Sequence, residues 1–161
     1  MPAAVSVEQL KTVEDYLATL AGRIEDPEAI TSEIAQEVAE SCRMLFEDGV
    51  DPWGTDWEPL ADSTKRQRRG SGARAAILRD TGALMNSVVG YGRGNEAIVG
   101  AGTGPSAAYA RIHLFGGRAG RGRRAKIPAR PYLPVTGGEV VLPEEWEADI
   151  LDIIRTKLGD D

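Results

Sequence analysis

The 161-residue sequence predicts a single α+β domain: N-terminal helices, then a small antiparallel β-sheet of three to five strands with a long basic loop, then a C-terminal helix. Two stretches near the N-terminus and one at the C-terminus repeat apolar residues at steps of three and four, the period of a helix. Between them, short apolar segments are separated by glycine-rich turns, which is typical of strands. We expect a helical part at 1–49, a loop and sheet part at 50–142 and a helix at 143–161.

The first two helices are predicted from their apolar stripes and from the residues at their ends. Ser6 is expected to cap a first helix whose stripe ends at Ile24. Asp26 followed by Pro27 predicts the start of a second helix, because Asp caps a helix and Pro fits its first position. Gly49 is expected to end it. The apolar stripe of the second helix comprises Ile30, Ile34, Val38, Cys42, Leu45 and Phe46.

The segment 51–60, D-P-W-G-T-D-W-E-P-L, is rich in turn residues and aromatics. Trp53 and Trp57 are expected to be partly buried and to hold this loop against the helices. A short basic helix follows, with Asp62 or Ser63 as its cap and a Gly-Ser-Gly joint at its end.

Short strands are expected in the second half of the chain. Segments 88–91 and 97–100 flank a hairpin-like R-G-N-E linker. Residues 109–115 alternate in a way that predicts a strand, and two glycines end it. The residues that follow, 116–126, include no apolar side chain larger than Ala, so they predict a mobile basic loop. Residues 139–142 are expected to add one more short strand.

The net charge of −6 conceals three blocks of opposite sign. Residues 1–64 hold 3 basic and 15 acidic side chains, residues 65–130 hold 14 and 2, and residues 131–161 hold 2 and 8. Such blocks predict either a basic face for a polyanion or complementary faces that meet between subunits of a head-to-tail ring. We favour a protein partner, because no aromatic residue interleaves with the basic runs. The expected contact residues are Lys65, Arg66, Arg68, Arg69, Arg118, Arg121, Arg123, Arg124, Lys126 and Arg130.

Catalytic and metal-binding signals are weak. His113 is the sole histidine and Cys42 the sole cysteine, which leaves too few soft ligands for a zinc site and no internal disulfide. The glycine-rich runs do not match a phosphate-binding loop. We expect no catalytic residue, no metal and no cofactor; the catalytic alternative uses His113 as a base with Asp80 or Arg130 as its partner. Neither a membrane span nor a secretory signal is expected.

Four motifs, in this order, carry a resemblance to a known family. They are F-E-D-G-V-D-P-W-G-T-D-W-E-P-L-A-D-S-T at 46–64, I-L-R-D-T-G-A-L-M-N-S at 77–87, Y-A-R-I-H-L-F-G-G at 109–117 and I-P-A-R-P-Y-L at 127–133. With these motifs the chain resembles the virion morphogenesis (tail completion) family of Mu-like and P2-like tailed bacteriophages.

The resemblance implies a structural protein rather than an enzyme. Such a protein completes or terminates the tail and helps to form the head–tail junction as a ring, for which a hexamer is favoured. The implied partners are further copies of the chain, tail tube or sheath proteins, neck proteins and packaged DNA. Its place is the virion, after synthesis in the host bacterial cytoplasm. The alternative is a nucleic-acid-binding module that uses the basic segment 65–130.

The motif residues are expected to act as folding elements, fixing turns and strand ends. These are Gly49, Pro52, Gly54, Trp57, Leu60, Thr81, Gly82, Leu84, Tyr109, His113, Phe115, Gly116, Pro128, Arg130 and Pro131.

Overall fold

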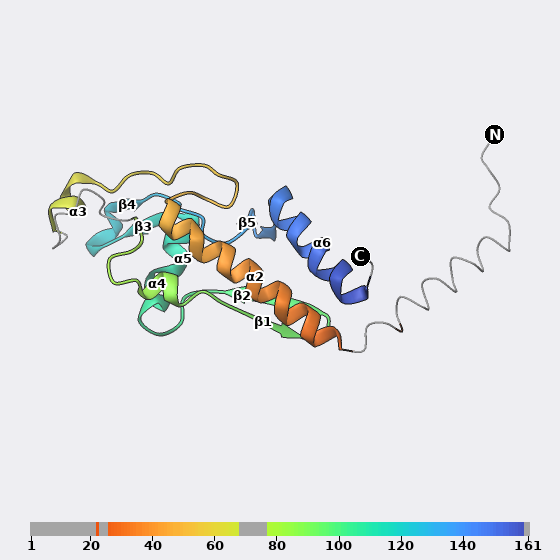
Figure 1. The fold of residues 1–161 in the computed structure, drawn as a ribbon. Coiled ribbons are helices and arrows are strands. Elements are labelled where there is room, and N and C mark those ends of the chain that lie inside the picture. The colour runs from red at the N-terminus through yellow and green to blue at the C-terminus, as the bar shows by residue number, and fades with distance from the viewer. Residues whose placement is uncertain (1–21, 23–25, 68–76, 160–161) are drawn as a thin grey trace, which may run out of the picture.

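The computed structural model describes Gly22 and residues 26–67 and 77–159, and the α+β class predicted from the sequence is confirmed (Figure 1). Its helices are α2 (Pro27–Asp48), α3 (Asp62–Gln67), α4 (Ala83–Asn86), α5 (Ala107–Phe115) and α6 (Glu144–Leu158), with single 3₁₀ turns at Gly104–Ser106 and Arg121–Arg123. Its strands are β1 (Val89–Arg93), β2 (Glu96–Gly100), β3 (Gly117–Ala119), β4 (Ala125–Ile127), β5 (Val135–Thr136) and β6 (Glu139–Val140).

The strands are antiparallel, as predicted, but in the described residues they form three separate two-stranded sheets rather than one sheet. β1 pairs with β2, β3 with β4 and β5 with β6, and each pair joins neighbours in the sequence. Because each pair is a local hairpin, it is held by the body of the protein on which it packs rather than by further strands.

Helix α2 begins and ends where its local sequence predicts. The Oδ1 atom of Asp26 accepts a hydrogen bond from the backbone N–H of Ala29 at 3.0 Å, and Pro27 occupies the first helical position. Gly49 adopts a left-handed backbone (φ 74°), and its N–H donates to the carbonyl of Leu45 at 2.8 Å. These caps satisfy backbone groups that a helix end would otherwise leave unpaired. The first predicted helix, at 6–24, lies outside the described residues apart from Gly22, so only the second can be compared.

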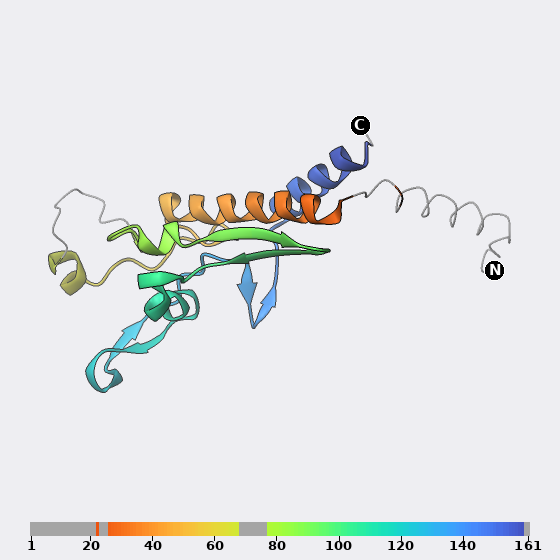
Figure 2. The same ribbon diagram turned by 90° about the horizontal axis from the view of Figure 1, so that it is seen from below.

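α2 lies directly on the β1–β2 hairpin, because two glycines of β1 face it (Figure 2). A Cβ atom at Gly90 would lie 1.9 Å from the carbonyl oxygen of Ala35, and one at Gly92 would lie 2.5 Å from the nitrogen of Ser32. Ser32 Oγ accepts a hydrogen bond from the N–H of Gly92 at 3.1 Å. The run G-Y-G-R-G therefore serves close packing of a strand on a helix.

The core gathers where α2 meets the middle of the chain. Phe46 contacts two other rings, Trp57 at a centroid distance of 5.5 Å and Tyr132 at 5.3 Å. Trp57 Nε1 donates to the carbonyl of Pro131 at 2.9 Å, so the loop after α2 is joined to a segment far along the sequence. Both tryptophans were expected to be partly buried; Trp57 is buried more fully, at 4% exposed, and Trp53 keeps 39% of its surface exposed. The buried hydrophobic cluster comprises Val38, Ala39, Cys42, Leu45, Phe46, Trp57, Leu78, Leu84, Val88, Ala110, Leu114 and Tyr132.

The prediction of a strand at 109–115 is wrong, because these residues form helix α5. Ala110 and Leu114, four residues apart, are buried together, while Tyr109 and His113 contact each other ring to edge at a centroid distance of 5.7 Å. In each pair the two residues are four positions apart, so they are neighbours on the same face of the helix. The alternation that suggested a strand is also compatible with a helix in so short a window, and the packing of α5 on the core decides between them.

The prediction of a mobile loop at 116–126 is also wrong, because these residues form the β3–β4 hairpin. Gly117 pairs with Ile127, and the hairpin turns through Gly120 and Gly122, both of which have positive φ angles (78° and 71°). Arginine and alanine are weak strand formers, so strand propensity alone gives little signal here. The glycines allow the turn, and the pairing then follows from the geometry of the chain.

Helix α6 follows Pro143, as predicted, and packs along α2 (Figure 1). Its contact face is half-buried, and Lys157 Nζ lies 2.7 Å from Glu33 Oε2 of α2. That face comprises Trp146, Ile150, Ile153, Ile154 and Leu158. Within the described part of the chain, no helix has the length and apolar character needed to span a bilayer.

Candidate functional site

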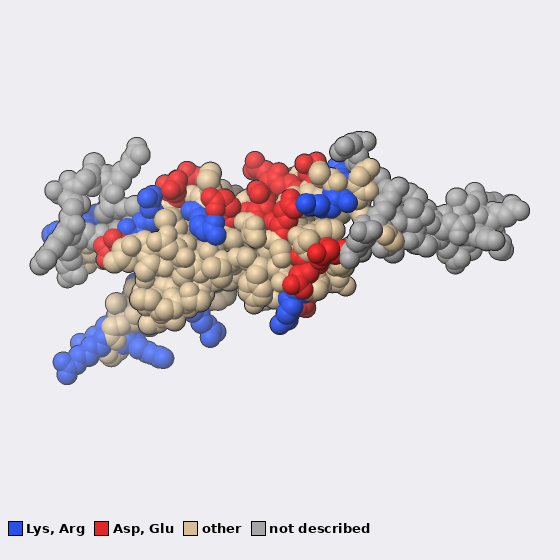
Figure 3. Space-filling model, turned by 60° about the horizontal axis from the view of Figure 1, so that its bottom comes forward, with Lys and Arg blue, Asp and Glu red and all other residues tan. Residues whose placement is uncertain are grey.

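The main basic surface is the β3–β4 hairpin with its turn, residues 116–127, which we call the basic arm. Its cations are exposed and gather at a tip that projects from the body, at the lower left of Figure 3. Among the described residues, no carboxylate lies within ion-pair distance of any of them. Five of the predicted contact residues are therefore brought together: Arg118, Arg121, Arg123, Arg124 and Lys126.

The base of the basic arm is firmly placed. Gly116 has φ 72° and ψ 177°, a conformation open in practice to glycine alone, and a Cβ there would lie 2.9 Å from the nitrogen of Ala129. The N–H of Arg130 donates to the carbonyl of His113 at 2.7 Å, which joins the segment after the arm to the end of α5. The arm thus leaves and re-enters the body at two neighbouring, fixed points.

Arg130, expected both as a contact residue and as a motif residue, lies inside the protein with 4% of its surface exposed. Its Nε donates to the carbonyl of Glu58 at 2.8 Å, and its Nη2 donates to the carbonyl of Pro59 at 3.2 Å. The buried guanidinium holds the loop after α2 against the segment after the basic arm. This placement corrects its assignment to the contact surface and supports its role in the fold.

The remaining predicted contact residues separate from the arm. Lys65 and Arg66 lie exposed on α3, where Lys65 Nζ is 3.4 Å from Asp62 Oδ1. Arg68 and Arg69 lie outside the described residues. Residues of α3 and β4 flank one groove, so the two basic elements border a common hollow.

This groove has a volume of about 890 Å³, and its lining includes Asp80, His113 and Arg130, the three residues of the catalytic alternative. The Arg130 guanidinium donates to backbone carbonyls, and the His113 ring packs against Tyr109. Both side chains thus have structural contacts. The groove is otherwise lined by Leu60, Ala61, Ser63, Thr64, Leu78, Thr81, Ala83, Leu84, Tyr109, Ala125, Lys126, Ile127 and Pro128.

Possible metal ligands and the Cys42 thiol are the remaining groups that could carry chemistry. No group of three or more His, Cys, Asp or Glu side chains that could hold a metal ion is found in the described ranges. Burial raises the pKa of the Cys42 thiol to about 12, against the attraction of the neighbouring Arg43 charge, so the thiol stays protonated at neutral pH.

The acidic counterpart lies on the solvent sides of α2 and α6, and we call it the acidic face. Figure 3 shows its carboxylates along the upper edge of the molecule, away from the basic arm. On α2 the acids recur at helical spacing with the exposed Met44 among them. The acidic face comprises Glu33, Glu37, Glu40 and Glu47 of α2 and Glu144, Glu145, Glu147, Asp149 and Asp152 of α6.

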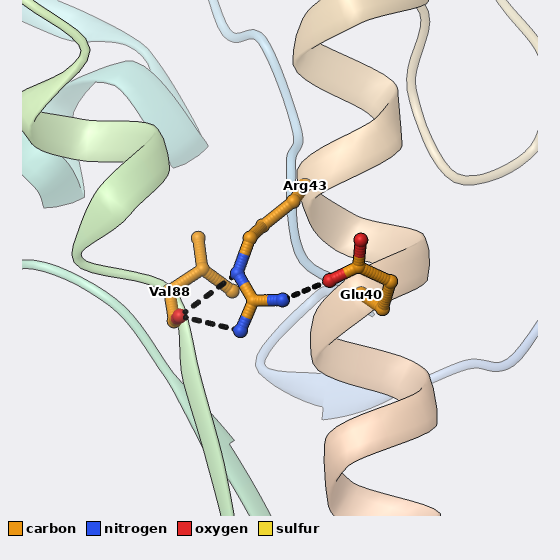
Figure 4. Close-up of polar contacts among 3 residues, drawn as sticks. All are labelled: Glu40, Arg43 and Val88. Atoms are coloured by element: carbon orange, nitrogen blue, oxygen red, sulfur yellow. Dashed lines mark hydrogen bonds and ion pairs between the residues drawn. The ribbon is translucent and has the colours of Figure 1, made fainter.

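Arg43, a cation on α2, is turned inward from this face (Figure 4). Its Nε and Nη2 atoms donate to the carbonyl of Val88 at 3.4 and 3.3 Å, and its Nη1 pairs with the carboxylate of Glu40. The charge of Arg43 is therefore used to join α2 to the start of β1. Sequence reasoning gave Arg43 no role, because a single arginine on a helix does not reveal the carbonyl that it meets.

Several other motif residues lie in turns or pack in the core. Gly54 has φ 83° in the turn after α2, and Pro52 is buried there. Thr81 Oγ1 accepts a hydrogen bond from the N–H of Ala83 at the start of α4, and Leu84 is 2% exposed. Tyr109, His113 and Phe115, which were expected at a strand end, lie on α5, and Phe115 keeps half of its surface exposed.

Asp51 and Tyr132 were missed by sequence reasoning. The Oδ1 atom of Asp51 accepts hydrogen bonds from the N–H groups of Trp53 and Thr55, both at 2.9 Å, and so shapes the turn. Tyr132 donates its hydroxyl proton to the carbonyl of Ala110 at 2.7 Å. An Asp opening a Pro-Trp-Gly turn is a recognisable signal for the first, whereas nothing local identifies the partner of the second.

Comparison with known proteins places these features in a family context. The profile of a family described as the phage virion morphogenesis family matches residues 8–159. The chain is also 49% identical over 78 residues to a protein named Mu-like prophage FluMu G protein 2 of Haemophilus influenzae. That similarity covers 48% of this chain, which spans about half (49%) of the length of the curated relative. No solved structure matches.

Proposed function

The chain belongs to the phage virion morphogenesis family, and from this premise we propose that it completes or terminates the phage tail and helps to form the head–tail junction. The match over residues 8–159 is the observation that carries this proposal. Membership of the family points to a structural role in the particle rather than to catalysis. The mature location is the tail or neck of the virion, after synthesis in the host cytoplasm.

The charge distribution supports assembly as a ring. The basic arm and the acidic face lie on different sides of one molecule, so each copy offers both halves of a complementary contact (Figure 3). Contacts of this kind, repeated head to tail, produce a closed ring when the rotation between copies closes. A sixfold ring matches the symmetry of a tail, and the protein partners are then the tail tube or sheath and the other neck proteins.

Nucleic-acid binding is the second candidate, and the basic arm is the observation that favours it. Arm cations exposed without a carboxylate partner in the described residues fit a phosphate backbone as well as they fit acidic side chains. Such binding would fall steeply with salt and with the loss of Arg121, Arg123 and Arg124. Titration of labelled duplex DNA at low and high salt measures it directly.

The proposal is tested in the phage or prophage that encodes the chain. Deletion of its gene is expected to give particles whose tails are unfinished or not joined to heads, as seen by electron microscopy, and expression of the intact chain in trans is expected to restore them. Lysates of a capsid-gene deletion serve as a control for a general loss of assembly. Normal yields of finished, infectious particles after the deletion would contradict the proposal.

A further inference from the structure

We infer that the basic arm of one copy docks on the acidic face of a second copy of the same chain. The inference rests on the proposed function in taking another copy as the partner, and it goes further by naming the two surfaces. The contact joins two different patches, and repeated from copy to copy it gives head-to-tail growth.

The two surfaces cannot neutralise each other within one molecule. In Figure 2, α2 and α6 lie along the upper edge and the β3–β4 hairpin extends away from them at the lower left. The base of the arm is held by the close approach of Gly116 to Ala129 and by the hydrogen bond from the Arg130 N–H to the His113 carbonyl, and from this base the hairpin points away from α2. Its charges are therefore presented outward.

The hairpin itself places like charges together. Arg118 and Lys126 are register partners on β3 and β4, so two cations stand directly opposite each other. Like charges in this position destabilise a strand pair. A row of carboxylates laid beside the hairpin would relieve this repulsion, which gives the arm a reason to bind an acidic surface.

The acidic face has the form that such an arm needs. Glu33, Glu37, Glu40 and Glu47 recur along the solvent side of α2, and at about 1.5 Å per residue they extend over roughly 20 Å. Large apolar side chains are also exposed on both surfaces: Met44 (53% exposed) and Leu151 (49% exposed) on the acidic face, and Phe115 (50% exposed) at the base of the arm. Apolar contacts surrounded by charge are the usual composition of a protein interface.

A protein partner fits the arm better than DNA does. Residues 116–127 include no aromatic side chain, and Phe115 at the base of the arm is a single exposed ring rather than the series on which successive bases stack. The chain itself supplies a surface of opposite sign, which DNA binding would leave unexplained. Exposed ion pairs contribute little individually, so the contact between two copies is expected to be weak in solution, sensitive to salt and strengthened by ring closure.

Paired charge reversals test the contact with the full-length chain. The arm variant carries Arg121→Glu, Arg123→Glu and Arg124→Glu, and the face variant carries Glu37→Lys and Glu47→Lys. Glu40 and Glu33 are left intact because they pair with Arg43 and Lys157. Two matched controls, Arg79→Glu and Glu139→Lys, reverse exposed charges outside both surfaces. Circular dichroism melts verify that each variant is folded.

Sedimentation equilibrium and native mass spectrometry then measure association, at protein concentrations up to about 1 mM. The unmodified chain is expected to associate at about 50 mM salt and to dissociate at about 500 mM. Each variant alone is expected to associate at least about tenfold more weakly, because each reversed residue now meets a residue of its own sign on the unmodified surface of the next copy. An equimolar mixture of the two variants is expected to recover association, since each supplies the complement that the other lacks.

A chain that stays monomeric at low salt, or a mixture that does not recover association, would overturn the inference. So would an arm variant that loses only DNA binding while its self-association is unchanged. The proposed function is judged separately: if the arm variant completes tails normally in the deleted phage, the docking is wrong while the role in tail completion stands.

Discussion

Replacing Gly90 with alanine tests the contact on which the α2–β1 packing depends. The added Cβ would lie 1.9 Å from the carbonyl oxygen of Ala35 and 2.4 Å from its carbonyl carbon. Real Cβ atoms essentially never approach closer than about 3.0 Å, so α2 must withdraw from β1 by about 1 Å. Both neighbouring atoms are backbone, which means that no side-chain rotation can relieve the clash.

The magnitude follows from what that withdrawal disturbs. Overpacking of a close contact costs about 1–3 kcal/mol, and the absence of a flexible neighbour puts this site at the upper end. The shift also stretches hydrogen bonds between α2 and the hairpin, among them those from Gly92 N–H to Ser32 Oγ at 3.1 Å and from Thr31 Oγ1 to the Gly94 carbonyl at 3.0 Å. We expect the free energy of unfolding to fall by about 3 kcal/mol.

Gly100→Ala is the matched control, because Gly100 lies in the same hairpin, has no positive φ, and has no neighbouring atom within 4 Å of the position that an added Cβ would occupy. This change is expected to be neutral or to stabilise by up to about 1 kcal/mol through the unfolded chain. Urea denaturation followed by far-ultraviolet circular dichroism measures both variants. Equal unfolding free energies for the two would refute the argument that Gly90 is required by close packing.

Three further predictions concern buried polar groups. Arg130→Met should lower the free energy of unfolding by about 2–3 kcal/mol, as measured by urea denaturation, because the carbonyl of Glu58 loses a charged donor in a buried site. Tyr132→Phe should cost about 1 kcal/mol in the same assay, through loss of the 2.7 Å hydrogen bond from its hydroxyl to the Ala110 carbonyl. Ionisation of the Cys42 thiol should leave the free energy of unfolding unchanged below about pH 9 and lower it between pH 9 and about 12. The reason is that the thiol loses its proton at the ordinary pKa of 9.0 in the unfolded state but only at about 12 in the folded state. Cys42→Ala should flatten this part of the pH profile, and an unchanged slope would contradict the assignment.

The sequence predicts best where structure depends on neighbouring residues. Asp26, Pro27 and Gly49 bound α2 because capping is decided within one turn of the chain. The β1–β2 hairpin follows likewise from two short apolar runs around a glycine-containing turn. Segregation of charge into blocks is also visible in the sequence, although only the fold shows that the acidic helices and the basic arm lie on different sides.

Contacts between residues far apart in the chain determine the features that could not be predicted from the sequence. Residues 109–115 satisfy the period of a strand and that of a helix, and the burial of Ala110 and Leu114 on the core selects the helix. Arg130 resembles one more cation in a basic block, since nothing in its neighbours reveals that the carbonyls of Glu58 and Pro59 will surround it. For both, the deciding partner is remote in sequence.

The fixed base of the basic arm has an evolutionary consequence. Its two ends are set by Gly116 and by the hydrogen bond from Arg130 to His113, and no side chain between Arg118 and Lys126 belongs to the buried core. Selection can therefore lengthen, shorten or recharge the hairpin with little penalty to folding. Related chains can in this way differ in the length and charge of the hairpin while the scaffold beneath stays the same.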